Sequence, residues 1–144
     1  DAAVPKPDQG APGTCGNTFE TQVFQLVNQE RAKAGVPGLK CHIGAGKVAR
    51  DYSALMCSTG HFSHTGPDGS SPWARLKKGG VSFLTAGENI AAGQSSPGAV
   101  MSSWMKSWGH RANILSSKFS HIGVGYASCG KGYKHYWTQC FIKQ

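Results

Sequence analysis

His64, Glu88 and His110 are the side chains best suited to chemistry in this sequence of 144 residues. Neutral imidazoles are good ligands for Zn²⁺ and similar divalent ions. A carboxylate beside them can serve as a third ligand, as an orienting partner or as a general base. A metal ion held by so few protein groups keeps positions open for water. The three residue types would suit an open site for a divalent ion such as Zn²⁺, but their types and spacing alone leave open whether they share one site.

Glu88 is the only acidic side chain between residues 69 and 144, a stretch that also holds nine Lys and Arg residues. Residues 1–68 carry six basic and six acidic side chains, so the second half accounts for the whole formal charge of +8. A basic face attracts anionic surfaces such as cell-wall polymers, lipid head groups or nucleic acid. These positive charges are scattered and are not interleaved with stacking aromatics, so specific nucleic-acid binding is not expected.

Other arrangements of reactive residues fit the sequence less well. It contains no HExxH spacing, no GxSxG elbow and no glycine-rich phosphate loop. A Ser-His-Asp triad would have to use Asp51 or Asp68, and a Cys-His nucleophile pair stays open although most cysteines are expected to be oxidised or buried. The other histidines are interpreted as structural, surface or hydrogen-bonded residues: His61 as a neighbour of His64, and His42, His121 and His135.

The five cysteines favour an oxidising, extracellular setting. They form no CxxC pair, which argues against a structural zinc site, and their odd number leaves at least one thiol free or paired with another molecule. Cys129 and Cys140 flank a predicted hairpin, so a bridge between them is favoured. Cys15–Cys57 is the second choice, Cys57–Cys129 stays an alternative, and Cys41 is expected to be a buried free thiol.

Helical spacing of apolar residues predicts the elements that position these side chains. A first helix starts at the N-cap Asn17 and stops at Gly35, a second covers about residues 45–58, and a short helix spans 72–78. A fourth follows Ser96 and Pro97. Its predicted apolar face, interpreted as core, consists of Val100, Met101, Trp104, Met105 and Trp108.

Residues 87–93 are predicted to form a short strand, and 122–126 and 136–142 a terminal hairpin that turns at 129–134. This order lacks regular βαβ alternation, so an α+β fold with a small antiparallel sheet covered by helices is expected. Residues 1–16 form a Pro/Gly-rich arm, expected to be flexible, and 17–144 a single domain. No apolar run reaches the length of a transmembrane segment. The chain is expected to be extracellular and monomeric.

Six stretches of the sequence together resemble the CAP superfamily of cysteine-rich secretory proteins, antigen 5 allergens and plant pathogenesis-related proteins, and especially its short bacterial-type and microbial members. They follow the family's order over about residues 18–142. They are LVNQERAKAGVPGL (26–39), FSHTGPDGSSPWARLKKGG (62–80), AGENIAAG (86–93), SWMKSWGHRANIL (103–115), and HIGVGYA (121–127) with YWTQCF (136–141).

The resemblance implies a three-layer α-β-α sandwich with a central cleft. In much of the family that cleft holds two His and two Glu, often with a divalent metal such as Zn²⁺. His64, Glu88 and His110 match three of the four positions, and Ser107 stands where the second glutamate is expected. The missing carboxylate implies weaker metal affinity and argues against a mechanism that needs two carboxylates.

The resemblance also implies a secreted binding protein for a lipid, a sterol or a cell-surface or cell-wall ligand, with a role in defence or host interaction. The loop around Trp73 and Phe83, together with Asn89, supplies the expected ligand-facing positions, with core packing of the two aromatics as an equal alternative. One alternative is a metal-dependent hydrolase in which Glu88 activates a bound water. Another is a structural, wall-associated protein. With a single carboxylate in the site, binding is favoured over catalysis.

Overall fold

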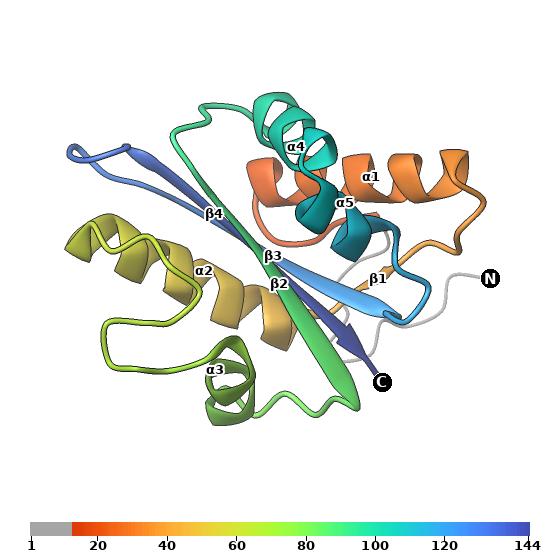
Figure 1. Ribbon diagram of the computed structural model, residues 1–144, viewed down its shortest axis with the longest axis horizontal. Helices are drawn as coiled ribbons and strands as arrows, with labels where there is room; N and C mark the ends of the chain where they lie inside the picture. The colour runs from red at the N-terminus through yellow and green to blue at the C-terminus, as the bar shows by residue number, and fades with distance from the viewer. Residues whose placement is uncertain (1–12) are drawn as a thin grey trace.

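The computed structural model describes residues 13–144, which fold into three layers (Figure 1). Helices α1, α4 and α5 cover one face of a central sheet, and α2 and α3 cover the other. The predicted α+β class and α-β-α sandwich are confirmed. The helices are α1 (Thr18–Lys33), α2 (Ile43–Thr59), α3 (Pro72–Lys78), α4 (Pro97–Lys106) and α5 (Trp108–Leu115), and the strands are β1 (Lys40–Cys41), β2 (Thr85–Ala92), β3 (His121–Ser128) and β4 (His135–Lys143).

The first twelve residues of the predicted arm lie outside the described part of the chain. At its end the backbone is anchored, because Cys15 is buried and bonded to Cys41. In the described residues, no helix is long and apolar enough to cross a membrane.

The four strands lie in the order β1-β3-β4-β2. Strands β2, β4 and β3 pair antiparallel as predicted, and β1 adds a parallel pair with β3 that the sequence pattern did not indicate. A strand of two residues has too few positions to show an alternating pattern. Strand β2, which carries Glu88, lies at one edge of the sheet with Glu88 opposite Cys140 of β4.

Helix α2 lies unusually close to β3 because that strand has glycine at two alternate positions. A Cβ atom on Gly123 would be 2.2 Å from the backbone carbonyl carbon of Ala45, and one on Gly125 would be 2.1 Å from that of Ala49. Backbone cannot move away as a side chain can, so only glycine fits at these two positions. The close contact holds the first turns of α2 against β3, and the helix then runs to Thr59, where the loop that carries His64 begins.

The helix predicted to extend from Pro97 through Trp108 is in fact two helices. Ser107 has an extended backbone between α4 and α5, and this break turns the following residue away from the core. Trp108 is consequently 87% exposed, so the prediction that it shares the apolar face of α4 is wrong. The prediction holds for Val100, Met101 and Trp104, which are buried in the largest hydrophobic cluster.

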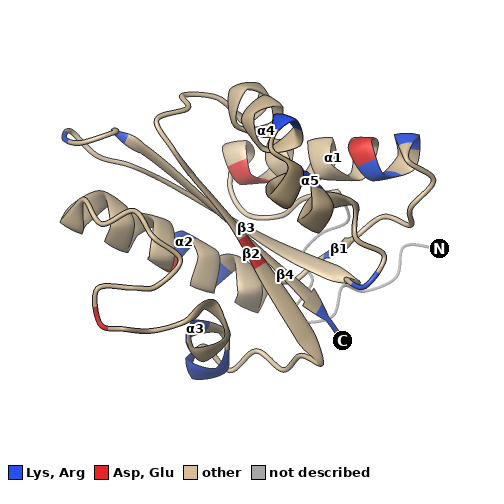
Figure 2. Ribbon diagram, viewed as in Figure 1, with Lys and Arg blue, Asp and Glu red and all other residues tan. Residues whose placement is uncertain are grey.

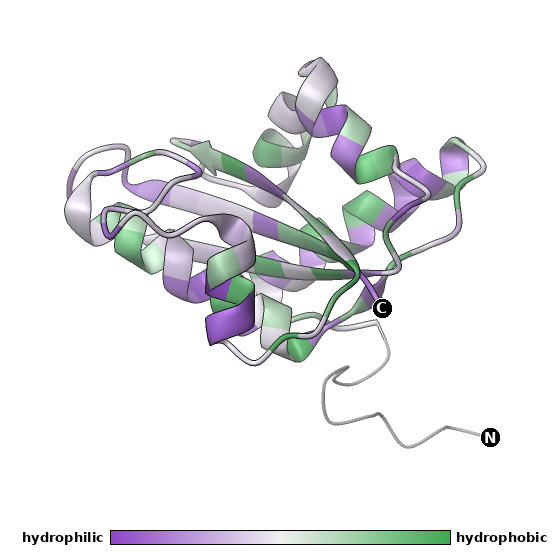
Figure 3. Ribbon diagram, turned by 60° about the horizontal axis from the view of Figure 1, so that its bottom comes forward, coloured by the Kyte–Doolittle hydropathy of each residue, from purple (hydrophilic) through white to green (hydrophobic). Residues whose placement is uncertain are grey.

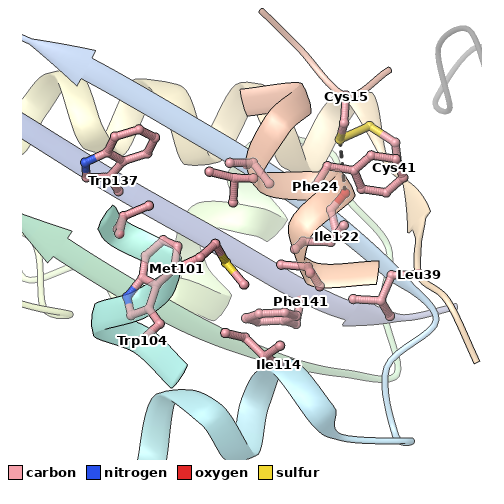
Figure 4. Packing of buried hydrophobic residues seen from close by; sticks show 14 of the residues in the cluster. Cys15, Phe24, Leu39, Cys41, Met101, Trp104, Ile114, Ile122, Trp137 and Phe141 are labelled. Carbon is pink, nitrogen blue, oxygen red and sulfur yellow. Dashed lines mark hydrogen bonds between the residues drawn. A yellow bond between two sulfur atoms is a disulfide. The ribbon is translucent and has the colours of Figure 1, made fainter. Parts of the chain in front are cut away.

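That largest cluster fills the space between the sheet and the layer of α1, α4 and α5 (Figure 4). Its two tryptophans also satisfy their ring nitrogens: Trp104 Nε1 donates to the Ile90 carbonyl at 3.1 Å, and Trp137 Nε1 to the Gln94 carbonyl at 2.8 Å. Hydrophobic residues recur along the strands where they run between the helical layers (Figure 3). Burial of this apolar surface is the main force that holds α4 and α5 on the sheet.

A buried arginine fastens the far end of α5. Arg31 of α1 is 1% exposed and donates from Nη1 to the carbonyls of Ile114 and Ser116, both at 2.8 Å, and from Nε to the carbonyl of Pro37 at 2.7 Å. Two of these acceptors are at the C-terminal end of α5, where carbonyls lack partners within the helix. Arg31 therefore ties α5, and with it His110, to α1.

The disulfides differ from the favoured predictions. Cys15 pairs with Cys41, and Cys57 pairs with Cys129. The Cys129–Cys140 and Cys15–Cys57 bridges are therefore wrong, as is the free thiol at Cys41, whereas the Cys57–Cys129 alternative is confirmed. The strand register gives the reason: Cys129 lies beyond the end of β3, while Cys140 pairs with residues in the middle of β2 and β3. Cys140 is the free, buried cysteine.

Candidate functional site

Glu88 is buried and shared between two partners. Its side chain is 2% exposed. Oε1 accepts a hydrogen bond from His64 Nδ1 at 2.8 Å, and Oε2 accepts one from Arg75 Nη2 at 2.8 Å. A buried carboxylate is costly without such partners. Figure 2 shows this acidic position on β2, with the basic residues of α3 below it in that view. Both oxygens of the only acid in the second half of the chain are therefore engaged.

Arg75 is the site residue that the sequence analysis missed. Besides Glu88, it contacts the loop before α3, with Nη2 donating to the His64 carbonyl at 3.0 Å and Nη1 to the Ser70 carbonyl at 2.9 Å. Its guanidinium carbon also lies 3.5 Å from the centre of the Tyr52 ring, a cation–π contact. One signal in the sequence could have indicated it. Glu88 is the only acid among many basic residues in the second half of the chain, and a buried carboxylate needs a cation as its partner.

His64 presents one ring nitrogen to the solvent side. Its side chain is 52% exposed, and its Nδ1 is bonded to the Glu88 carboxylate. An ionised carboxylate only accepts hydrogen bonds, so Nδ1 carries the proton and Nε2 of the neutral ring keeps its lone pair. A histidine oriented by a carboxylate in this way is a common arrangement around protein-bound metals.

His110 lies in the first turn of α5, and its Nδ1 is 2.8 Å from Ser107 Oγ. Burial, and after it the charge of His64, lowers the pKa of His110 below its ordinary value. Its ring is therefore neutral at pH 7, the form that binds metals. Ser107, at the position expected for a second glutamate, supplies a neutral hydroxyl that orients His110 in place of a carboxylate.

The two histidines reach the site from opposite layers of the fold, and consecutive residues of β2 hold them. Glu88 points to the side of α2 and α3, where it holds His64. Asn89 points to the other side, where its Nδ2 donates to the His110 carbonyl at 3.0 Å and to Gln139 Oε1 at 3.0 Å. Asn113 Nδ2 completes the network by donating to Asn89 Oδ1 at 2.9 Å.

Asn89 is 0% exposed, so it supports the site from beneath instead of facing a ligand as predicted. The other two predicted ligand-facing residues differ from each other. Trp73 is half exposed, with its Nε1 donating to the Ala86 carbonyl at 3.2 Å. Phe83 is partly buried against the hydrophobic cluster beneath α3. Of these predicted contacts, only Trp73 presents substantial apolar surface to solvent.

The remaining histidines have local roles. His61 Nε2 lies 2.7 Å from the Thr65 carbonyl, which closes the loop before His64. His42 is buried and caps α2, where its Nδ1 accepts from the Ala45 amide at 2.9 Å. His121 and His135 have ring nitrogens within hydrogen-bond distance of Ser120 and Tyr126, respectively. These contacts account for the four histidines as structural residues, as interpreted from the sequence.

The arrangement suits metal binding by two imidazoles better than acid–base chemistry. Within residues 13–144, no group of three or more His, Cys, Asp or Glu is placed to hold a metal ion. Among the described residues, the side chains of this region that could donate to a divalent ion are therefore at most the two imidazoles of His64 and His110. Each oxygen of Glu88 already accepts one hydrogen bond, from His64 or from Arg75, and its side chain is 2% exposed, so burial limits the access of a water or a metal to it.

Comparisons with known proteins relate this chain to one protein family. The model of the cysteine-rich secretory protein family, CAP, matches residues 24–141. YkwD of Bacillus subtilis (strain 168) is 44% identical over 126 residues, which cover 88% of this chain and 48% of YkwD. The chain thus spans about half the length of that relative.

Solved structures agree with the sequence comparison. An extracellular protein of Bacillus anthracis that contains an SCP domain has a TM-score of 0.80 and 36% identity, over 88% of this chain and 40% of that one. An outer surface protein of Borrelia burgdorferi also has a TM-score of 0.80, over 92% of this chain and 98% of that one. Its 22% identity shows a shared fold alone.

Proposed function

The chain belongs to the cysteine-rich secretory protein (CAP) family, and from this premise we propose that it is an extracellular binding domain whose cleft takes a divalent cation between His64 and His110. The observation that carries the proposal is the orientation of the two rings. Each Nδ1 is held by a neighbouring side chain, Glu88 or Ser107. With Nδ1 as the hydrogen-bond donor in both rings, each Nε2 is the atom available to a metal, and Zn²⁺ is the expected ion.

The charge balance of the cleft favours an anionic ligand. Arg75 neutralises Glu88, Ser107 is uncharged, and the two imidazoles are neutral when they bind a metal. A bound divalent cation would supply an electropositive centre with open coordination positions. We therefore expect a lipid or cell-wall component with an anionic group, and Trp73 is placed to contact its apolar part. A sterol offers a single hydroxyl and no charge, so this geometry favours it less.

The hydrolase alternative has less support from the geometry. A general base needs a free lone pair within hydrogen-bond reach of the water that it activates. Both oxygens of Glu88 accept hydrogen bonds, and the side chain is almost fully buried. The described residues place no second carboxylate beside the two histidines to take over this role.

Calorimetric titration with Zn²⁺ tests the proposal. The unmodified protein should show one site, and His64→Ala and His110→Ala should each abolish it. Glu88→Gln should weaken Zn²⁺ affinity by about 10- to 100-fold, because it removes the carboxylate that orients a ligand. His61→Ala is the matched control, since its ring is bonded within its own loop. Unchanged affinity in both His64→Ala and His110→Ala would refute the metal site.

The ligand part of the proposal has a separate test. Binding of a fatty acid such as palmitate is measured with Zn²⁺ and with a chelator, in the unmodified protein and in the His64→Ala, His110→Ala double variant. The proposal expects saturable binding that requires both Zn²⁺ and the two histidines. Absence of saturable binding would instead favour the structural, wall-associated alternative.

A further inference from the structure

Two exposed aromatic rings, those of Phe62 and Tyr133, lie together at one end of the molecule, at the opposite end of the sheet from the C-terminus of the chain. We call this the hairpin end. It consists of the turn between β3 and β4, residues 129–134, and the loop that leaves α2, residues 60–65 (Figure 1). Phe62 is 45% exposed and Tyr133 is 61% exposed, and their ring centres are 6.4 Å apart. Contact of adjacent exposed aromatic rings with water is unfavourable in free energy, and such a pair indicates a surface that another molecule covers when the protein functions.

The hairpin end is held in shape by covalent and hydrogen bonds. The Cys57–Cys129 disulfide joins the last turns of α2 to the start of the turn. Within the turn, the Cys129 amide donates to the Lys134 carbonyl at 2.9 Å. Tyr133 also packs edge-on against the buried ring of Tyr136, with ring centres 6.2 Å apart. The aromatic pair is therefore presented by a fixed scaffold and does not need to be ordered on binding.

The charge of the hairpin end is entirely positive. Lys131 and Lys134 are exposed in the turn, and neither residues 52–67 nor residues 89–144 contain an Asp or Glu. Figure 2 shows blue positions at this tip without red beside them. Like charges would oppose contact between two copies of this surface.

We propose that the hairpin end docks the domain onto a bilayer that contains anionic lipids. Aromatic rings favour the head-group depth of a membrane, where their apolar bodies leave water. Lysines beside them gain from the negative surface potential of anionic lipids. An anionic polymer would engage the lysines but would give no burial to Phe62 and Tyr133. His64 lies in the same loop as Phe62, but neither His64 nor His110 takes part in this docking, so vesicle binding measured with a chelator present tests the proposal apart from metal binding.

Vesicle partitioning tests the proposal. The unmodified protein should bind vesicles of phosphatidylcholine with phosphatidylglycerol, and should bind pure phosphatidylcholine weakly. Lys131→Gln with Lys134→Asn should weaken partitioning about 30-fold, since each lysine near an anionic membrane contributes about fivefold. Asn is chosen at position 134 because Lys134 has φ 69°, a left-handed conformation that Asn tolerates. Phe62→Ser with Tyr133→Ser should weaken partitioning at least as much.

A matched pair of lysines at the opposite end of the sheet provides the control. Lys118 lies just before β3, and Lys143 is the last residue of β4, so both are remote from the turn. Lys118→Gln with Lys143→Gln removes the same charge and should leave partitioning within a few-fold of the unmodified protein. An equal loss in both lysine pairs would overturn the proposal in favour of diffuse attraction by net charge. Unchanged partitioning of the Phe62→Ser, Tyr133→Ser variant would overturn it in favour of an anionic polymer.

Discussion

Replacement of Arg75 by Met should destabilise the fold strongly, because it leaves Glu88 buried without its cation. The two side chains are 11% and 2% exposed and their closest charged atoms are 2.8 Å apart, so solvent screens this pair little. Removal of one partner of a buried ion pair costs about 3–5 kcal/mol in the free energy of unfolding. Met keeps much of the packing volume against Tyr52, so most of the loss reports on the charge. For a chain of this size the melting temperature should fall by about 10 °C or more.

A double-mutant cycle separates the ion pair from the rest of Arg75. Glu88→Gln alone should cost about 2 kcal/mol, since its amide still accepts from His64 while Arg75 keeps its carbonyl partners. The double variant carries neither charge, so it should be more stable than the sum of the two single losses predicts, by about 2 kcal/mol. Urea unfolding of the four proteins with the disulfides intact, followed by tryptophan fluorescence, gives these values.

The control for this cycle is Lys78→Met, an exposed cation of the same helix, which should change stability by less than about 0.5 kcal/mol. Additive losses from Arg75→Met and Glu88→Gln would show that the two side chains are not coupled. In that case the account of Glu88 as a carboxylate fixed by Arg75 would be wrong, and Glu88 would regain an oxygen for a metal or for a water.

Three further predictions concern the cysteines and His110. Cys57→Ser with Cys129→Ser opens a loop of 72 residues and should cost about 4 kcal/mol in urea unfolding. Because burial raises the pKa of the Cys140 thiol, a thiol reagent should label one cysteine per chain only after denaturation; labelling of the native protein would contradict its burial. Burial also lowers the pKa of His110 in the folded protein, so the unfolded chain binds a proton on this ring more readily. The free energy of unfolding therefore decreases as the pH falls below about 6.5, the ordinary pKa of histidine. With a chelator present, His110→Asn should flatten the dependence of melting temperature on pH between 7 and 5, and an unchanged slope would count against this assignment.

The sequence predicted best those features that depend on residues close together in the chain. Asn17 and Glu20 form the capping box of α1, with each side chain bonded to the other's backbone amide. Ser71 and Ser96 cap α3 and α4, each followed by proline. Such caps join groups three residues apart, so the local pattern alone contains the information.

Features that depend on contacts across the fold were predicted poorly. The bridge from Cys57 to Cys129 spans 72 residues, and spacing along the chain cannot choose among the possible partners. Arg75 was overlooked because its role becomes visible only when α3 packs beside β2. Trp108 was misplaced because one extended residue, Ser107, divides a segment whose apolar spacing continues across the break.

The resemblance to a known family singled out His64, Glu88 and His110, and the structure shows how strand β2 holds the segments that carry the two histidines. Side chains of consecutive strand residues point to opposite faces of a sheet. Glu88 and Asn89 use that alternation to hold one histidine from each helical layer. The single carboxylate therefore has an organising role: it fixes the ring of His64 and receives a neutralising cation from α3. Ser107 supplies a neutral hydroxyl where the resemblance expects a second carboxylate, so in the described residues His110 is oriented without a charge. The lone acid of the basic half is thus explained by the two side chains that it holds, His64 and Arg75.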